Sequence, residues 1–152
     1  FTSTYDIYRI VGFIAPSQDT EARIKLRASG SDVGASSQYT RIERYTNRDP
    51  SDSSSGQETL TGHTSNEWMV AGGGMKSDSD SAPCWFDLTF FTNTSRQFFN
   101  GTGSFIKNTN ARVMTGYVGG ITNSNLNPDG IKIFLWSGNI RYAEVSIFGV
   151  VQ

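Results

Sequence analysis

Apolar and polar residues alternate with a period of two along much of the chain, which is the pattern of half-buried β-strands. The alternation is cleanest from Ala22 to Ala28, where apolar and basic residues take turns. The segment Tyr5–Ile14 carries apolar residues on both of its faces, and this predicts a strand buried on both sides. One or two shorter strands are predicted within Thr59–Ala71. Further strands are predicted at Gln38–Thr46, Cys84–Phe91, Arg112–Ile121, Ile131–Trp136 and Ile140–Val151.

Turn-forming residues separate these segments. Long polar loops are predicted at Asn47–Gly56, Gly72–Pro83 and Thr122–Gly130. The Asn-Gly pair at 100–101 predicts the type I′ turn of a hairpin spanning Phe98–Phe105. Only five leucines and eight alanines stand against 16 glycines, 19 serines and 15 threonines, so helices are disfavoured throughout. The predicted fold is an all-β, antiparallel two-sheet β-sandwich, jelly-roll-like, with eight or nine strands.

The length of 152 residues predicts a single domain spanning 1–152. The chain begins at Phe1 without methionine, and this suggests a truncated or processed N-terminal part. A net charge of −1 disfavours binding to nucleic acid or to an anionic membrane surface. The apolar runs are far shorter than the roughly 20 residues of a membrane-spanning helix.

The residues available for chemistry are few. With one cysteine, Cys84, and one histidine, His63, no zinc site and no other cofactor is predicted. His63 is the only imidazole base and no G-x-S-x-G motif is present, so the expectation is that the protein is not an enzyme. The pairs Asp49/Asp52 and Asp78/Asp80 offer oxygen ligands for calcium but lack the EF-hand pattern, which favours solvated loops.

Two residue sets are candidates for contact with other molecules. Arg23, Lys25 and Arg27 form a basic row on one strand, which either meets an acidic partner or is the solvated face of that strand. Nineteen aromatic residues exceed what one small core needs, and some are therefore expected at a subunit interface or stacked on sugar rings. The aromatic candidates for these roles are Tyr39, Tyr45, Phe99 and Tyr142.

The two ends of the chain carry an ordered set of short motifs. These are Tyr5–Val11 (YDIYRIV), Ala22–Ser29 (ARIKLRAS), Gly130–Ile140 (GIKIFLWSGNI) and Ser146–Val150 (SIFGV). In this combination the chain resembles a β-sandwich module of tailed-bacteriophage virion proteins, found in tail-fibre-like, tail-associated and small capsid-surface proteins. The chain departs from that pattern at Arg141–Glu144, where the module has small, glycine-containing residues.

The resemblance implies a non-enzymatic structural protein on the surface of the virion that assembles as a homotrimer. Its partners would be further copies of itself and the major capsid protein or a tail protein. Capsid decoration (cement) protein and tail-fibre head module remain two open interpretations. The alternative is a carbohydrate-binding, lectin-like module that contacts host surface glycans through its loops.

Overall fold

The two ends of the chain pair with each other, which closes the fold. The computed structural model describes residues 1, 5–34, 39–48, 55–65, 67–76, 83–92, 96–107 and 113–150. These residues contain eleven strands, one of them only two residues long, and no helix. In chain order they are β1 (Ile7–Pro16), β2 (Thr20–Ala28), β3 (Ser31–Asp32), β4 (Tyr39–Arg48), β5 (Ser55–Ser65), β6 (Trp68–Met75), β7 (Cys84–Phe91), β8 (Phe98–Ile106), β9 (Val113–Thr122), β10 (Gly130–Leu135) and β11 (Ile140–Val150).

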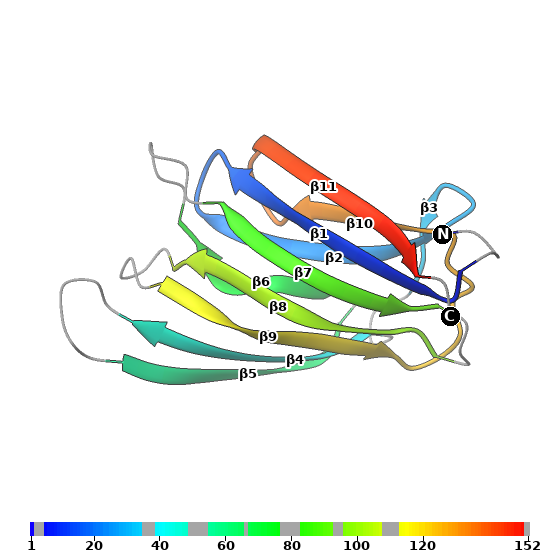
Figure 1. Ribbon diagram of the computed structural model, residues 1–152, viewed down its shortest axis with the longest axis horizontal. Coiled ribbons are helices and arrows are strands. Elements are labelled where there is room, and N and C mark those ends of the chain that lie inside the picture. The colour runs from blue at the N-terminus through cyan, green and yellow to red at the C-terminus, as the bar shows by residue number, and fades with distance from the viewer. Residues whose placement is uncertain are drawn as a thin grey trace.

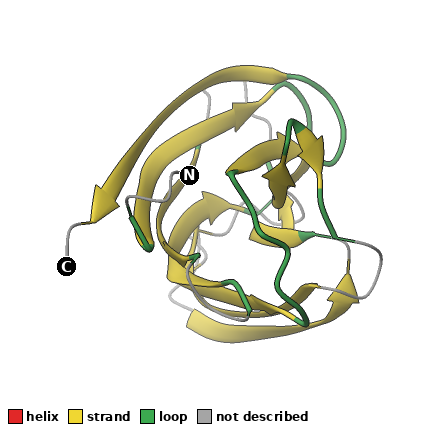
Figure 2. Ribbon diagram, turned by 90° about the vertical axis from the view of Figure 1, so that its right-hand side faces the viewer, coloured by secondary structure: helices red, strands yellow, loops and turns green. Residues whose placement is uncertain are grey.

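The strands form two antiparallel sheets of unequal width. The large sheet has seven strands in the order β11-β1-β7-β8-β9-β4-β5, as Figure 1 shows from top to bottom. In the small sheet, β2 pairs with β10 on one side and with β3 and β6 on the other. The large sheet curves around the small one (Figure 2). The predicted all-β antiparallel sandwich is confirmed.

The pairing of the chain ends is the jelly-roll-like feature of the topology. β1 pairs with β11 in the large sheet, and β2 pairs with β10 in the small sheet. The turns that join them also contact each other, because Ser17 and Asn139 exchange hydrogen bonds of 2.9 and 3.0 Å. Gly138, in the turn before Asn139, has a φ of 74°, a conformation that residues with a side chain rarely adopt. By contrast, β7, β8 and β9 follow one another as a simple meander.

The core lies between the sheets and is rich in aromatic rings. Trp68 is fully buried. Its ring centroid lies 4.7 Å from that of Phe99 and 4.9 Å from that of Tyr39. Ile24 and Leu26 of β2, also fully buried, lie on the inner face of the small sheet. Burial of such side chains is the main stabilising contribution to a fold of this kind.

Three sequence predictions about local structure are wrong. Residues 98–106 form one continuous strand instead of a hairpin, and Gly101 is extended within it instead of turning. A Cβ at Gly101 would overlap the backbone of Asp87 on β7. Glycine at this position therefore allows β7 and β8 to approach each other closely. β6 continues through Gly72 to Met75, so the predicted loop starts later. On β1 the outer face is only half-buried, because no second layer covers it.

Close strand packing at Gly116 gives a stability prediction. A Cβ there would overlap the carbonyl oxygen of Arg44 on the neighbouring strand β4. We expect Gly116→Ala to lower the free energy of unfolding by about 1–3 kcal/mol through overpacking. Gly130→Ala is the matched control, since its added Cβ would meet its nearest atom only at 4.0 Å. Urea unfolding of both variants tests this, and equal midpoints would contradict it.

Candidate functional site

Three of the four aromatic candidates are core residues, which corrects the sequence prediction for them. Tyr39 and Tyr45 are completely buried and Phe99 is 2% exposed. Each tyrosine hydroxyl is satisfied internally: that of Tyr39 donates to the carbonyl of Val33, and that of Tyr45 to the carbonyl of Val70 at 3.3 Å. Burial also raises the pKa of Tyr39. Tyr142, on β11, is the one of the four candidates that is exposed.

The basic row lies on the outer face of β2, but its charges are paired within the molecule. Arg23 bonds both Glu21, at 2.5 Å, and the buried Glu67. Its guanidinium also lies 3.6 Å from the ring centroid of Trp136. Lys25 lies 3.9 Å from Glu67.

Arg27 completes the row and lies 3.5 Å from Asp32 on β3. β2 is the central strand of the small sheet, so the basic row does not protect an exposed sheet edge. The acidic residues that the row contacts belong to this chain, so its charges are paired without an external acidic partner.

Six of the eleven large apolar side chains that are exposed in the described residues lie on β11. Every residue from Ile140 to Val150 is exposed, and β11 is the edge strand of the large sheet. Register separates its two faces: Ile147 pairs with the buried Ile10 and therefore faces inward, whereas Phe148 pairs with Arg9 and faces outward. Both Ile147 and Phe148 are 54% exposed. We call this strand, with its exposed apolar residues, the β11 edge.

The inward side of the β11 edge is open because the small sheet ends before it. β10 is the edge strand of the small sheet, and its inward residues Ile131, Ile133 and Leu135 are only partly buried. Val145 and Ile147 face the same side and are exposed. The sandwich therefore exposes apolar side chains of both sheets along one edge.

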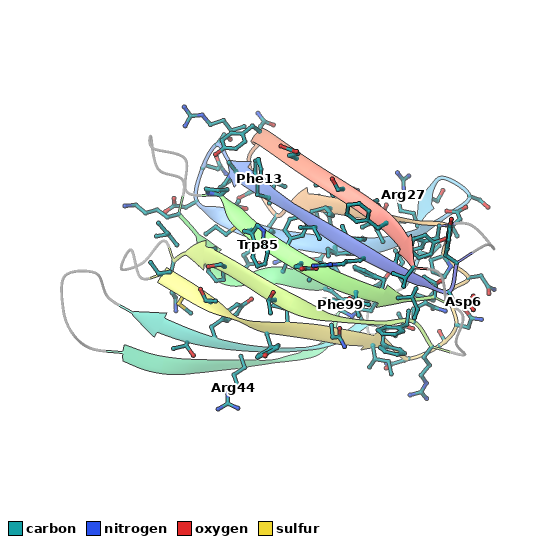
Figure 3. All side chains as sticks on the ribbon, viewed as in Figure 1. Asp6, Phe13, Arg27, Arg44, Trp85 and Phe99 are labelled. Atoms are coloured by element: carbon teal, nitrogen blue, oxygen red, sulfur yellow. The ribbon has the colours of Figure 1, made fainter. Side chains whose placement is uncertain are left out.

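The outward side of the β11 edge joins a shallow apolar hollow of about 390 Å³. Phe13, Trp85 and Phe148 line it, together with Arg9 and Glu144 at its polar rim. Figure 3 shows Phe13 and Trp85 on the neighbouring strands β1 and β7. The ring of Tyr142 packs edge-on against Phe13 with centroids 5.5 Å apart. The departure from the phage module at Arg141–Glu144 thus lies at this surface.

A second exposed aromatic residue stands apart from the β11 edge. Tyr117, on the outer face of β9, is 73% exposed and lies beside Thr102 and Arg44 in the strand register. Sequence reasoning missed it, although the alternation in Arg112–Ile121 puts it on one face with Val113, Thr115 and Ile121. The pattern does not show which face is covered.

The structure describes only some of the residues that the sequence offers for chemistry. Burial raises the pKa of the Cys84 thiol to about 12, so it is protonated at neutral pH. His63 lies within β5, the other edge strand of the large sheet. The Asp49/Asp52 and Asp78/Asp80 pairs fall outside the described residues. In the part of the chain that is described, no three potential His, Cys, Asp or Glu ligands cluster as a metal site, and no helix is long and apolar enough to cross a membrane.

Comparison of the chain with protein-family models, with curated proteins and with solved structures finds no match.

The ion pair on the outer face of β1 and β7 gives a pH prediction. Arg9 binds Asp87 through two hydrogen bonds of 2.9 and 2.5 Å, and this holds the pKa of the Asp87 carboxyl below its ordinary value. A lowered folded-state pKa adds stability above the ordinary value of about 3.9, and this stability is lost as the pH falls through the folded-state pKa. Arg9→Met should therefore be less stable than wild type at pH 6, and the gap should close below pH 4.

Urea unfolding between pH 2 and pH 7 measures this gap. Asp87→Asn in the Arg9→Met background is the control, because it should remove the remaining acid dependence of this pair. A gap that stays constant across the range would show that Arg9 stabilises the sheet by packing alone.

Proposed function

We propose that the protein is a non-enzymatic structural component of the bacteriophage virion surface, acting as a capsid decoration (cement) protein or as the head module of a tail fibre. Its partners are further copies of itself and the major capsid protein or a tail protein. The four motifs that carry the resemblance support this proposal, because they form two paired sets, β1 with β11 and β2 with β10. The Ser-Gly-Asn phrase of the closing motif lies in the turn that bonds to Ser17.

The observation that carries the proposal is the β11 edge. Natural proteins protect edge strands with charge, bulges or a covering segment, because an exposed apolar edge invites aggregation. Here the exposed apolar residues outnumber the charged ones, which are Arg141 and Glu144. A stable virion component with such a strand needs a partner that covers the strand. Further copies of the same chain can supply this partner, because a structural protein is present at high local concentration in the particle.

The geometry of the β11 edge suits a closed ring of copies. Its inward side is the open edge of the sandwich, and its outward side joins the hollow of Phe13 and Trp85. A contact between two different surfaces, repeated around an axis, generates a ring when the rotation closes. In the proposed homotrimer, the open edge of one copy packs against the outward hollow of the next.

Carbohydrate binding through the loops is the alternative function. Much of Asn47–Gly56 and Gly72–Pro83 lies outside the described residues. The third loop, Thr122–Gly130, is tied to the body of the protein: the buried Gln97 donates to Asn125 at 2.7 Å and accepts from the amide of Leu126 at 2.9 Å. Such a loop is ordered enough to present side chains to a ligand.

Substitutions on the β11 edge test the assembly. We expect wild type to have a mass three times that of the 16.7 kDa chain. Ile147→Lys and Phe148→Lys should each shift the mass toward monomer, since a charge buried at an interface is strongly unfavourable. Light scattering coupled to size-exclusion chromatography measures the mass, and circular dichroism checks that the sheets persist.

Val113→Lys is the matched control for these variants. Val113 is an exposed apolar residue on β9, at the first position of that strand, and three strands separate β9 from β11 in the sheet. Its substitution should leave the mass unchanged. A monomeric wild type, or a trimer that both β11 variants leave intact, would overturn this interface.

Gold-labelled antibody on intact phage particles tests the virion assignment. Electron microscopy should show label over the shell facets for a decoration protein, or at the tail for a fibre module. Particles without label, from a source that expresses the chain, would contradict the assignment.

A further inference from the structure

The outer face of the large sheet has a polar region centred on Tyr117. This residue is the most exposed of the large apolar and aromatic side chains in the described part of the chain. In the strand register Thr102 lies on one side of it and Arg44 on the other. Figure 3 shows Arg44 projecting from β4 away from the body of the protein.

Two hollows flank Tyr117 and share it as a common wall. One, of about 460 Å³, is lined by Arg44, Thr46, Thr115 and Thr102 as well as Tyr117. The other, of about 380 Å³, is lined by Asp87, Asn100, Thr102 and Tyr117. Both volumes fall in the range of small-molecule sites, roughly 300–1,000 Å³.

The lining of these hollows selects the chemistry of a ligand. Hydroxyl, amide, carboxylate and guanidinium groups surround a single aromatic ring, so a wholly apolar ligand would leave polar groups without partners. A pyranose has an apolar face of C–H groups and a rim of hydroxyls, and it can therefore pack on the ring of Tyr117 while its hydroxyls bond the surrounding side chains. With a net charge of −1 and Asp87 in the wall, the site does not suit a phosphate backbone.

Two of the polar groups are held in place before any ligand binds. The carboxylate of Asp87 is fixed by both nitrogens of Arg9, and each of its oxygens can still accept a further hydrogen bond. The hydroxyl of Thr115 lies 2.7 Å from that of Ser104. Preorganised polar groups lose less entropy on binding than mobile ones do.

We infer that this face of the sheet is a binding site for neutral oligosaccharides, in which Tyr117 stacks on one pyranose ring and Asp87, Asn100 and the flanking threonines bind its hydroxyls. The site lies on the strands and away from the predicted sugar-binding loops. It does not rest on the virion proposal, because the β11 edge and Tyr117 are separate surfaces. The two hollows give room for more than one sugar unit.

Saturation-transfer-difference NMR on the full chain tests this site. The probes are neutral trisaccharides of glucose, galactose, mannose and N-acetylglucosamine, each added singly. We expect at least one of them to receive saturation through its ring C–H protons. Tyr117→Ala should weaken its binding about fivefold to tenfold, whereas Tyr117→Phe should keep most of it because the ring face makes the contact.

Val113→Ala is the control, since Val113 lies on the same face of β9 but lines neither hollow. Asn100→Ala should weaken trisaccharide binding without changing the mass of the oligomer. The monomeric Ile147→Lys protein should keep the affinity per site, which separates this site from the assembly surface. No transfer to any trisaccharide, or equal affinity in Tyr117→Ala and wild type, would overturn the inference.

Discussion

The seven-stranded sheet is wider than the layer that covers it, and the other surface features follow from this difference. Sandwiches bury one face of each sheet against the other. The small sheet is centred on β2, so burial is complete near Ile24 and Leu26 and fails toward β11. The uncovered strand carries apolar residues on both of its faces, Val145 and Ile147 inward and Phe148 outward, so apolar side chains face solvent on both of its sides.

In a sandwich of two sheets, no layer covers the outer face of the large sheet, so this face is left to solvent. That face divides by composition, with apolar rings near β11 and hydroxyl, amide and carboxylate groups near β8 and β9. The first kind of surface suits contact between proteins, where aromatic residues are enriched. The second suits a hydroxyl-rich small ligand. In the two proposals one sheet carries both an assembly surface and a recognition surface, and the Arg9–Asp87 ion pair lies between them.

Because the chain ends pair with each other, sequence motifs that are 100 residues apart lie side by side in the fold. Ser29 and Asp129 are joined by a hydrogen bond of 2.7 Å, and Lys132 bonds Asp32 at 3.1 Å. These contacts tie β10 to the end of β2 and to β3. The basic row on β2 belongs to the same system, because Asp32 pairs both with Arg27 of the row and with Lys132 of β10.

The sequence by itself determined the all-β class, most strand positions and which residues share a face, because these depend on local propensity and on a period of two. It did not determine which face is covered: Tyr39, Tyr45 and Phe99 became core, whereas Tyr117 and Phe148 remained exposed. Asn100-Gly101 likewise carries a turn signal that close packing against β7 overrides. Only the tertiary structure decides such choices, since burial depends on which strands a second layer covers, and that is a property of the whole sandwich.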